Sequence, residues 1–138
     1  MKRFSLWFVI VVALFMVCTI SPVAVHAQDM VTVQVIEGTI CTDVANRTCY
    51  NSSTRFPTPI DKLFCFTKIV GAQDDTNVIH VWYFGETERA RVQLSVRSSS
   101  WRTYSSKIIQ PYEIGDWHVD VLGEDGQLLM VIPFEVHH

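Results

Sequence analysis

The clearest structural signal in this sequence is the stretch 88–97, which reads Glu-Arg-Ala-Arg-Val-Gln-Leu-Ser-Val-Arg. Apolar and polar residues alternate along it, which is typical of a β-strand with one buried and one exposed face. Further runs rich in β-branched and aromatic residues lie at 31–35, 63–70, 78–84, 101–109, 117–121 and 128–136. Turn residues separate these runs. The sequence therefore predicts an all-β protein, an immunoglobulin-like antiparallel β-sandwich of about seven strands.

The turn between the runs 78–84 and 88–97 decides which side chains face the core. If Gly85-Glu86 is a two-residue turn, paired residue numbers sum to 171, and both His80 and Trp82 lie on the outer face. If the loop is one residue longer, the sum is 172 and Trp82 meets Ala90 inside. We expect the first register, because it collects the aliphatic side chains on one face.

Two further positions mark strand ends and edges. Asp125-Gly126 between the last two runs is a strong hairpin signal. Pro133 interrupts the final run, so that strand is expected to be an edge strand or to contain a bulge. Residues 42–61 are expected to form a long irregular excursion.

The amino-terminal segment has the layout of a secretory signal peptide. Two basic residues precede an apolar run at 4–20, and a small-residue cleavage site follows at 25–27. A membrane anchor is the alternative, but the run is shorter than the roughly 20 residues that a spanning helix needs. We expect a signal peptide at 1–27, a single β-sandwich domain at 28–138, and a secreted or periplasmic protein without a membrane span after cleavage.

Charge and cysteine content narrow the class further. The formal net charge of −3 includes Lys2 and Arg3, so removal of these two positive charges leaves −5 on the mature domain. An acidic domain is a poor nucleic-acid binder, so nucleic acid is not an expected partner. Cys41 and Cys49 flank a polar stretch and are predicted to form a disulfide, with Cys65 buried and free. Three cysteines also allow other pairings.

Several strings of the sequence match a known family. They are Trp-Arg-Thr-Tyr-Ser-Ser-Lys at 101–107, His-Val-Trp-Tyr at 80–83, Gly-Asp-Trp-His-Val at 115–119, and the ending from Asp125-Gly126 to Phe134. With them the chain resembles the bacterial domain of unknown function two-nine-one-four family, from about Cys41 to Val136. The resemblance implies a β-sandwich fold and an envelope setting, and it supplies no activity.

Two groups of residues are candidates for ligand binding. In the expected register, the first group forms an aromatic and cationic outer face of His80, Trp82, Phe84, Arg89 and Arg91. Rings stack on sugars, and arginine forks grip carboxylates or sulfates at two points. The second group comprises Trp101, Arg102, Tyr104 and Lys107. The plain alternative is that Trp82 belongs to the core and that the cations form ordinary surface ion pairs.

Other chemistries find little support in the sequence. The histidines and cysteines show no structural-zinc spacing, so neither a metal nor another cofactor is expected. The sequence contains no motif of a known hydrolase or nucleotide-binding loop, and we expect no enzyme. The first hypothesis is a binding module for a glycan or anionic polymer. The alternative is an envelope assembly domain that docks a partner protein through an exposed strand edge. The oligomeric state stays unknown at this level.

Overall fold

The computed structural model describes residues 32–138, so the predicted signal peptide and its cleavage site lie outside the described residues. The described chain folds into ten strands: β1 (Gln34–Cys41), β2 (Asp43–Ala45), β3 (Thr48–Tyr50), β4 (Arg55–Pro57), β5 (Lys62–Val70), β6 (Thr76–Phe84), β7 (Thr87–Val96), β8 (Ser100–Ile108), β9 (Gly115–Gly123) and β10 (Leu128–His137). Residues 32–138 contain no helix, and so none that is long and apolar enough to cross a membrane.

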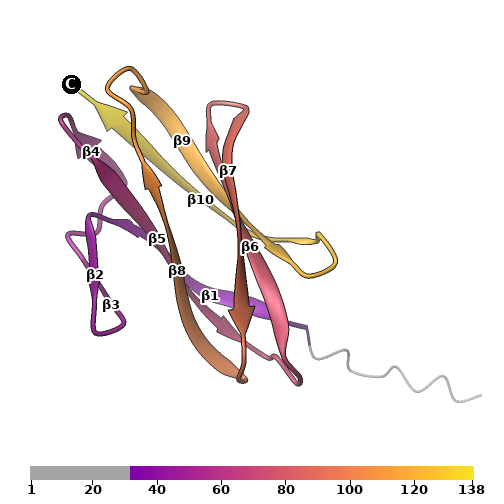
Figure 1. The fold of residues 1–138 in the computed structure, drawn as a ribbon. Helices are drawn as coiled ribbons and strands as arrows, with labels where there is room; N and C mark the ends of the chain where they lie inside the picture. Colours follow the sequence, from indigo (N-terminus) through magenta and orange to yellow (C-terminus); the bar gives the residue numbers. More distant parts are fainter. Residues whose placement is uncertain (1–31) are drawn as a thin grey trace, which may run out of the picture.

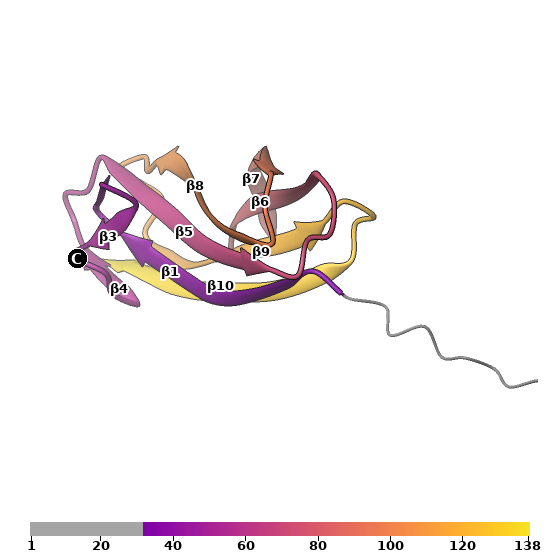
Figure 2. The ribbon, with the colours of Figure 1, turned by 90° about the horizontal axis from the view of Figure 1, so that it is seen from below.

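Seven of these strands are eight to ten residues long and build two packed sheets, as predicted. One sheet has the order β1-β5-β8, and the other has the order β4-β10-β9-β6-β7. Figure 2 shows the two sheets facing each other, with β1 beside β10 along one side. All the long strands pair antiparallel, which is consistent with an immunoglobulin-like β-sandwich.

The core fills the space between the sheets and follows the strand period of two. In β5, the side chains of Leu63, Cys65, Thr67 and Ile69 are fully buried between the sheets, while Phe64, Phe66 and Lys68 point to the other face. Rings from the other sheet complete the core. Phe134 packs against Trp82 and Trp117, with ring centroids 6.0 and 5.8 Å apart.

The region 42–61 contains more regular structure than the irregular excursion that we expected. β2 and β3 form a small antiparallel hairpin that lies outside the sandwich beside β1 (Figure 1). The predicted Cys41–Cys49 disulfide is confirmed, with a Cα–Cα distance of 5.9 Å, and it ties β3 of this hairpin to the end of β1. Cys65 is free and buried, also as predicted.

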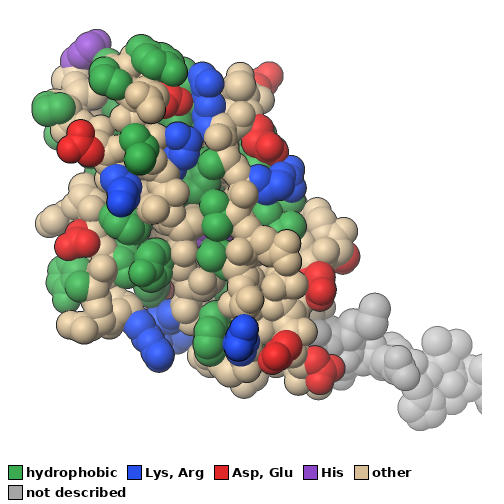
Figure 3. Space-filling view, in the orientation of Figure 1, with side chains coloured by type: hydrophobic (Ala, Val, Ile, Leu, Met, Phe, Trp, Pro, Cys, Tyr) green, Lys and Arg blue, Asp and Glu red, His purple; other side chains and the backbone are tan. Residues whose placement is uncertain are grey.

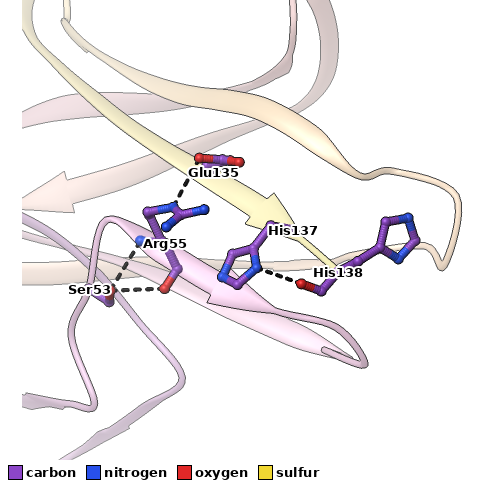
Figure 4. Close-up of polar contacts among 5 residues, drawn as sticks. All are labelled: Ser53, Arg55, Glu135, His137 and His138. Atoms are coloured by element: carbon purple, nitrogen blue, oxygen red, sulfur yellow. Dashed lines mark hydrogen bonds and ion pairs between the residues drawn. The ribbon is translucent and has the colours of Figure 1, made fainter.

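The last strand is an edge strand over most of its length, as Pro133 predicted. From Leu128 to Phe134, β10 pairs with β9 alone, and its register shift lies between Leu128 and Met130 rather than at the proline. The three-residue strand β4 then pairs with the end of β10 in parallel. Figure 4 shows Arg55 of β4 next to Glu135 of β10, where Arg55 Nε lies 3.1 Å from the carboxylate.

Candidate functional site

The hairpin β6–β7 does not keep the register that we expected. Tyr83 keeps the sum of 171 next to the turn, but a β-bulge leaves Arg89 unpaired, and Trp82 then pairs with Ala90, a sum of 172. Both His80 and Trp82 therefore turn inward and are fully buried, at 0% exposure. The prediction that these two residues form an exposed aromatic platform is wrong, because one inserted residue exchanges the two faces of a strand.

His80 and Trp82 instead belong to a chain of hydrogen bonds between the two sheets. The indole N–H of Trp82 donates to Ser105 Oγ at 3.0 Å, and Ser105 Oγ lies 2.7 Å from His80 Nδ1. On the other side of the ring, His80 Nε2 lies 3.1 Å from Thr67 Oγ1. The Thr67 hydroxyl donates to the backbone carbonyl of Thr103 at 3.4 Å.

A single protonation state of His80 satisfies every group in this chain. The indole of Trp82 only donates and the carbonyl of Thr103 only accepts, so the Ser105 hydroxyl donates to Nδ1 and the Nε2–H group donates to Thr67. A proton on Nδ1 would leave the Ser105 hydroxyl hydrogen without an acceptor in this chain. Burial lowers the pKa of His80 to about 4, which keeps the ring neutral near pH 7.

The Ser105–His80 contact has the distance of a nucleophile–base pair. However, Ser105 is only 4% exposed, so a substrate has no approach to its hydroxyl. The second nitrogen of His80 contacts the Thr67 hydroxyl, where a catalytic histidine commonly contacts an orienting carboxylate. The geometry fits a polar element of the core.

The two arginines of the predicted platform are both occupied by carboxylates. Arg89 Nε lies 3.3 Å from Glu113 Oε2, and Glu113 is only 2% exposed. Arg91 Nη2 lies 2.8 Å from Glu88 Oε1 at the surface. Both arginines therefore already have a carboxylate partner within the protein, buried for Arg89 and exposed for Arg91.

The second predicted group is divided between the two faces of β8. Trp101 and Lys107 lie on the side that faces the other sheet, where Trp101 packs against the core. The ammonium group of Lys107 donates to the carbonyl of Ile108 at 2.6 Å. Arg102 and Tyr104 lie on the opposite side, which faces solvent, and Tyr104 is 48% exposed.

Arg102 and Tyr104 meet residues of β5 on the outer face of the three-stranded sheet. Lys68 pairs with Arg102, and Phe66 pairs with Tyr104, so their side chains stand side by side. We call the outward residues of these two strands the cationic–aromatic face: Lys62, Phe64, Phe66, Lys68, Arg102 and Tyr104. In Figure 3, Lys and Arg side chains lie next to hydrophobic side chains over β5 and β8.

The cations of the cationic–aromatic face form no ion pair within the described residues, although Glu37 of β1 lies opposite Lys68 in the register. The ion pairs of residues 32–138 involve neither Lys62, Lys68 nor Arg102. The rings are arranged among these cations: Phe64 and Tyr104 pack edge to face at 6.0 Å, and Lys62 Nζ lies 5.8 Å from the Phe64 centroid. We predicted partly exposed rings beside cations without an ion-pair partner on β6 and β7, and the structure has this arrangement on β5 and β8.

The contribution of β5 to this face was missed at the sequence level. Leu63-Phe64-Cys65-Phe66 reads as one apolar run, because both faces of the strand carry apolar side chains. The available signal was the period of two in the flanking residues, since Lys62 and Lys68 lie at the same parity as the two phenylalanines.

Comparison with known families agrees with the resemblance seen in the sequence. Residues 75–136 match the family described as "Protein of unknown function (DUF2914)", and this part of the chain belongs to that family. The match spans β6 to β10 and is shorter than the stretch from about Cys41 over which the resemblance was expected. No curated protein matches the chain.

Proposed function

We propose that this member of the DUF2914 family is an exported, non-catalytic binding module that recognises an anionic polysaccharide through its cationic–aromatic face. One observation carries the proposal. Three cations without an ion-pair partner, Lys62, Lys68 and Arg102, share an open sheet face with aromatic rings. The mature domain is acidic overall, so its composition alone does not account for three cations on one face.

The chemistry of the face suits a charged sugar polymer. Arginine offers a planar fork to a carboxylate or sulfate, and lysine offers a point charge. The half-exposed ring of Tyr104 can cover the apolar face of a sugar ring, which contributes burial energy alongside the charges. Contacts of this kind are individually weak, so a polymer that engages several of them at once binds more tightly than a single unit.

Export is proposed together with this function. The signal-peptide layout of residues 1–27 and the Cys41–Cys49 disulfide both support an oxidising compartment outside the cytosol. Polysaccharides of the envelope or of the surroundings are the anionic polymers that such a protein meets.

Docking of a partner protein through a strand edge has less support. Each free edge carries a feature that discourages pairing with another strand. A register shift between Val35 and Glu37 interrupts β1, and Lys107 points inward on β8. The Arg89 bulge interrupts β7, and Pro133 interrupts β10. These features favour the sheet face over the sheet edges as the binding surface.

The test is a set of binding measurements on the purified domain. Polygalacturonate and dextran sulfate are the anionic probes, uncharged dextran is the neutral control, and a single-stranded oligonucleotide represents the nucleic-acid alternative. We expect binding to the anionic polysaccharides and none to dextran. The double variant Lys68→Glu, Arg102→Glu should weaken binding by about tenfold or more, because each lost charged hydrogen bond removes about 1.5–3 kcal/mol.

A matched control separates the face from the overall charge. Arg91→Glu, Arg97→Glu changes the net charge by the same amount away from the cationic–aromatic face, and it should leave the affinity within about twofold. Equal losses of affinity in both double variants would show that binding depends on net charge and not on the cationic–aromatic face. Binding to dextran, or tighter binding to the oligonucleotide, would contradict the proposed ligand class.

A further inference from the structure

A hollow lies between the β2–β3 hairpin and the outer face of the three-stranded sheet. Its volume is about 530 Å³, which is in the range of small-ligand sites. Arg102 of the cationic–aromatic face lines one part, and Arg47 from the tip of the hairpin lines another. Phe66 contributes a ring to the lining, and Thr39 and Thr48 contribute hydroxyl groups. Two guanidinium groups from distant parts of the chain therefore border the same hollow.

The backbone at Arg47 gives an independent reason to look for a function there. Ala45 pairs with Thr48, so Asn46 and Arg47 form the two-residue turn of the hairpin, with φ angles of 50° and 57°. Such turns favour Asn at the first position and Gly at the second, because glycine adopts positive φ without a steric penalty. Asn46 fits this rule and Arg47 does not. A long cationic side chain at a position suited to glycine is the kind of local strain that accumulates at functional sites.

The hairpin that carries Arg47 is fixed to the sheet. Cys49 of β3 is bonded to Cys41 at the end of β1, and Cys49 itself lines the hollow. Next to the disulfide, the backbone N–H of Thr42 donates to the carbonyl of Tyr50 at 3.2 Å. The hollow is thus held in place by a covalent bond and not only by the weak pairing of two three-residue strands.

We propose that this hollow is a subsite for one sugar residue that carries a single carboxylate, a uronic acid. This inference rests on the proposed function and assigns a specific unit of the polymer to a specific place. The forks of Arg47 and Arg102 match a carboxylate, and the threonine hydroxyls suit the hydroxyl groups of the sugar. Phe66, which is 6% exposed, contributes only a small apolar patch to the lining.

Glu37 refines the choice of ligand. Its carboxylate lines the same hollow, so the two arginines and this glutamate leave one net positive charge. A monoanion with hydroxyl groups fits that balance better than a doubly charged phosphate, because Glu37 repels excess negative charge and can accept a hydrogen bond from a sugar hydroxyl. Within the described chain, neither Arg47 nor Arg102 forms an ion pair with an acidic side chain.

The experiment titrates the domain with trigalacturonate, with the neutral trisaccharide of galactose, and with inorganic sulfate, by calorimetry or NMR. We expect saturable binding of trigalacturonate and little of the other two. Arg47→Gly should weaken the binding of trigalacturonate by about tenfold, because it removes a charged hydrogen bond. Its melting temperature should stay equal or rise, since glycine relieves the positive φ. The affinity of Arg47→Lys for trigalacturonate should lie between that of the unchanged domain and that of Arg47→Gly, because lysine keeps the charge and loses the fork.

A control variant tests the turn effect by itself. Asn51 also has a positive φ, of 56°, but does not line the hollow. Asn51→Gly should leave the affinity for trigalacturonate unchanged. A loss of affinity equal to that of Arg47→Gly would mean that hairpin geometry alone matters, and would overturn the role of Arg47.

The outcomes distinguish this inference from the proposed function. Suppose that polygalacturonate binds, trigalacturonate does not, and Arg47→Gly leaves polymer binding unchanged. The subsite is then wrong, and binding through the cationic–aromatic face remains supported. If trigalacturonate binds and no polymer does, the subsite stands and the polymer function falls. Binding of sulfate as tight as that of trigalacturonate would overturn the assignment to a uronic acid. Failure of every anionic probe would refute both proposals.

Discussion

The strand pairs β6–β7 and β5–β8 carry the same kinds of residue and use them in opposite ways. In β6–β7, Trp82 lies in the core and both arginines are bound to carboxylates. In β5–β8, the ring of Tyr104 lies at the surface and Arg102 has no ion-pair partner. Residue type alone therefore does not mark a binding surface. The face of the strand and the presence of an internal partner decide whether a cation is available.

The first way to break this comparison is to remove the two aromatic rings in turn. Trp82→Ala should lower the free energy of unfolding by about 3–5 kcal/mol, as loss of a core tryptophan does. Tyr104→Ala should change it by about 0.5 kcal/mol or less, because its ring is half exposed. Urea denaturation of both variants measures the difference. Similar losses for the two rings would mean that one of the two faces is assigned wrongly.

The pH dependence of stability tests the burial of His80 in β6. An unfolded histidine has a pKa of about 6.5, whereas burial lowers the pKa of His80 to about 4 in the folded protein. Between these values the unfolded state binds the extra proton, so stability is complete above pH 6.5 and decreases as the pH falls towards 4. The expected loss is about 3 kcal/mol.

Unfolding experiments across this pH range measure the acid effect, with two variants as references. His80→Gln should remove that part of the slope, while His118→Gln, which alters a partly exposed ring, should retain it. An unchanged slope in His80→Gln would show that other groups cause the acid sensitivity.

The smallest effect concerns the two arginines of β7. Arg89→Met removes the partner of the buried Glu113 and should lower the free energy of unfolding by about 1–3 kcal/mol. Arg91→Met breaks an exposed pair and should cost about 0.5 kcal/mol or less. Thermal unfolding of the two variants, side by side, gives the ranking. A reversed ranking would remove the structural reason for the bulge at Arg89.

Sequence reasoning was reliable where a feature depends on neighbouring residues. The period of two at 88–97, the Gly85-Glu86 turn and the Asp125-Gly126 hairpin are local, and the strands of the structure follow them. The disulfide was also predicted from a short polar stretch between two cysteines. These features need little information from the rest of the fold.

The register of β6–β7 could not be predicted in the same way. The bulge at Arg89 accompanies an ion pair with Glu113, which lies 24 positions later in the sequence. Similarly, the hollow at Arg47 forms where the β2–β3 hairpin meets Phe66 of β5 and Arg102 of β8. Both depend on contacts between distant segments, and local patterns contain no information on them.

The two outer faces of the sandwich carry different charges. The five-stranded sheet carries Glu88, Asp116, Asp120 and Glu135 on its solvent side, opposite the cations of β5 and β8. Arg55 and Arg91 compensate Glu135 and Glu88 on this face, so Asp116 and Asp120 supply its excess negative charge, and the net charge of the mature domain has the same sign as an anionic polymer. At physiological salt the Debye length is about 8 Å, less than the about 10 Å between packed sheets. Salt therefore weakens the repulsion between the acids of the five-stranded sheet and a polymer on the cationic–aromatic face. The proposed function therefore requires a polymer to bind in one orientation, with the five-stranded sheet turned to the solvent.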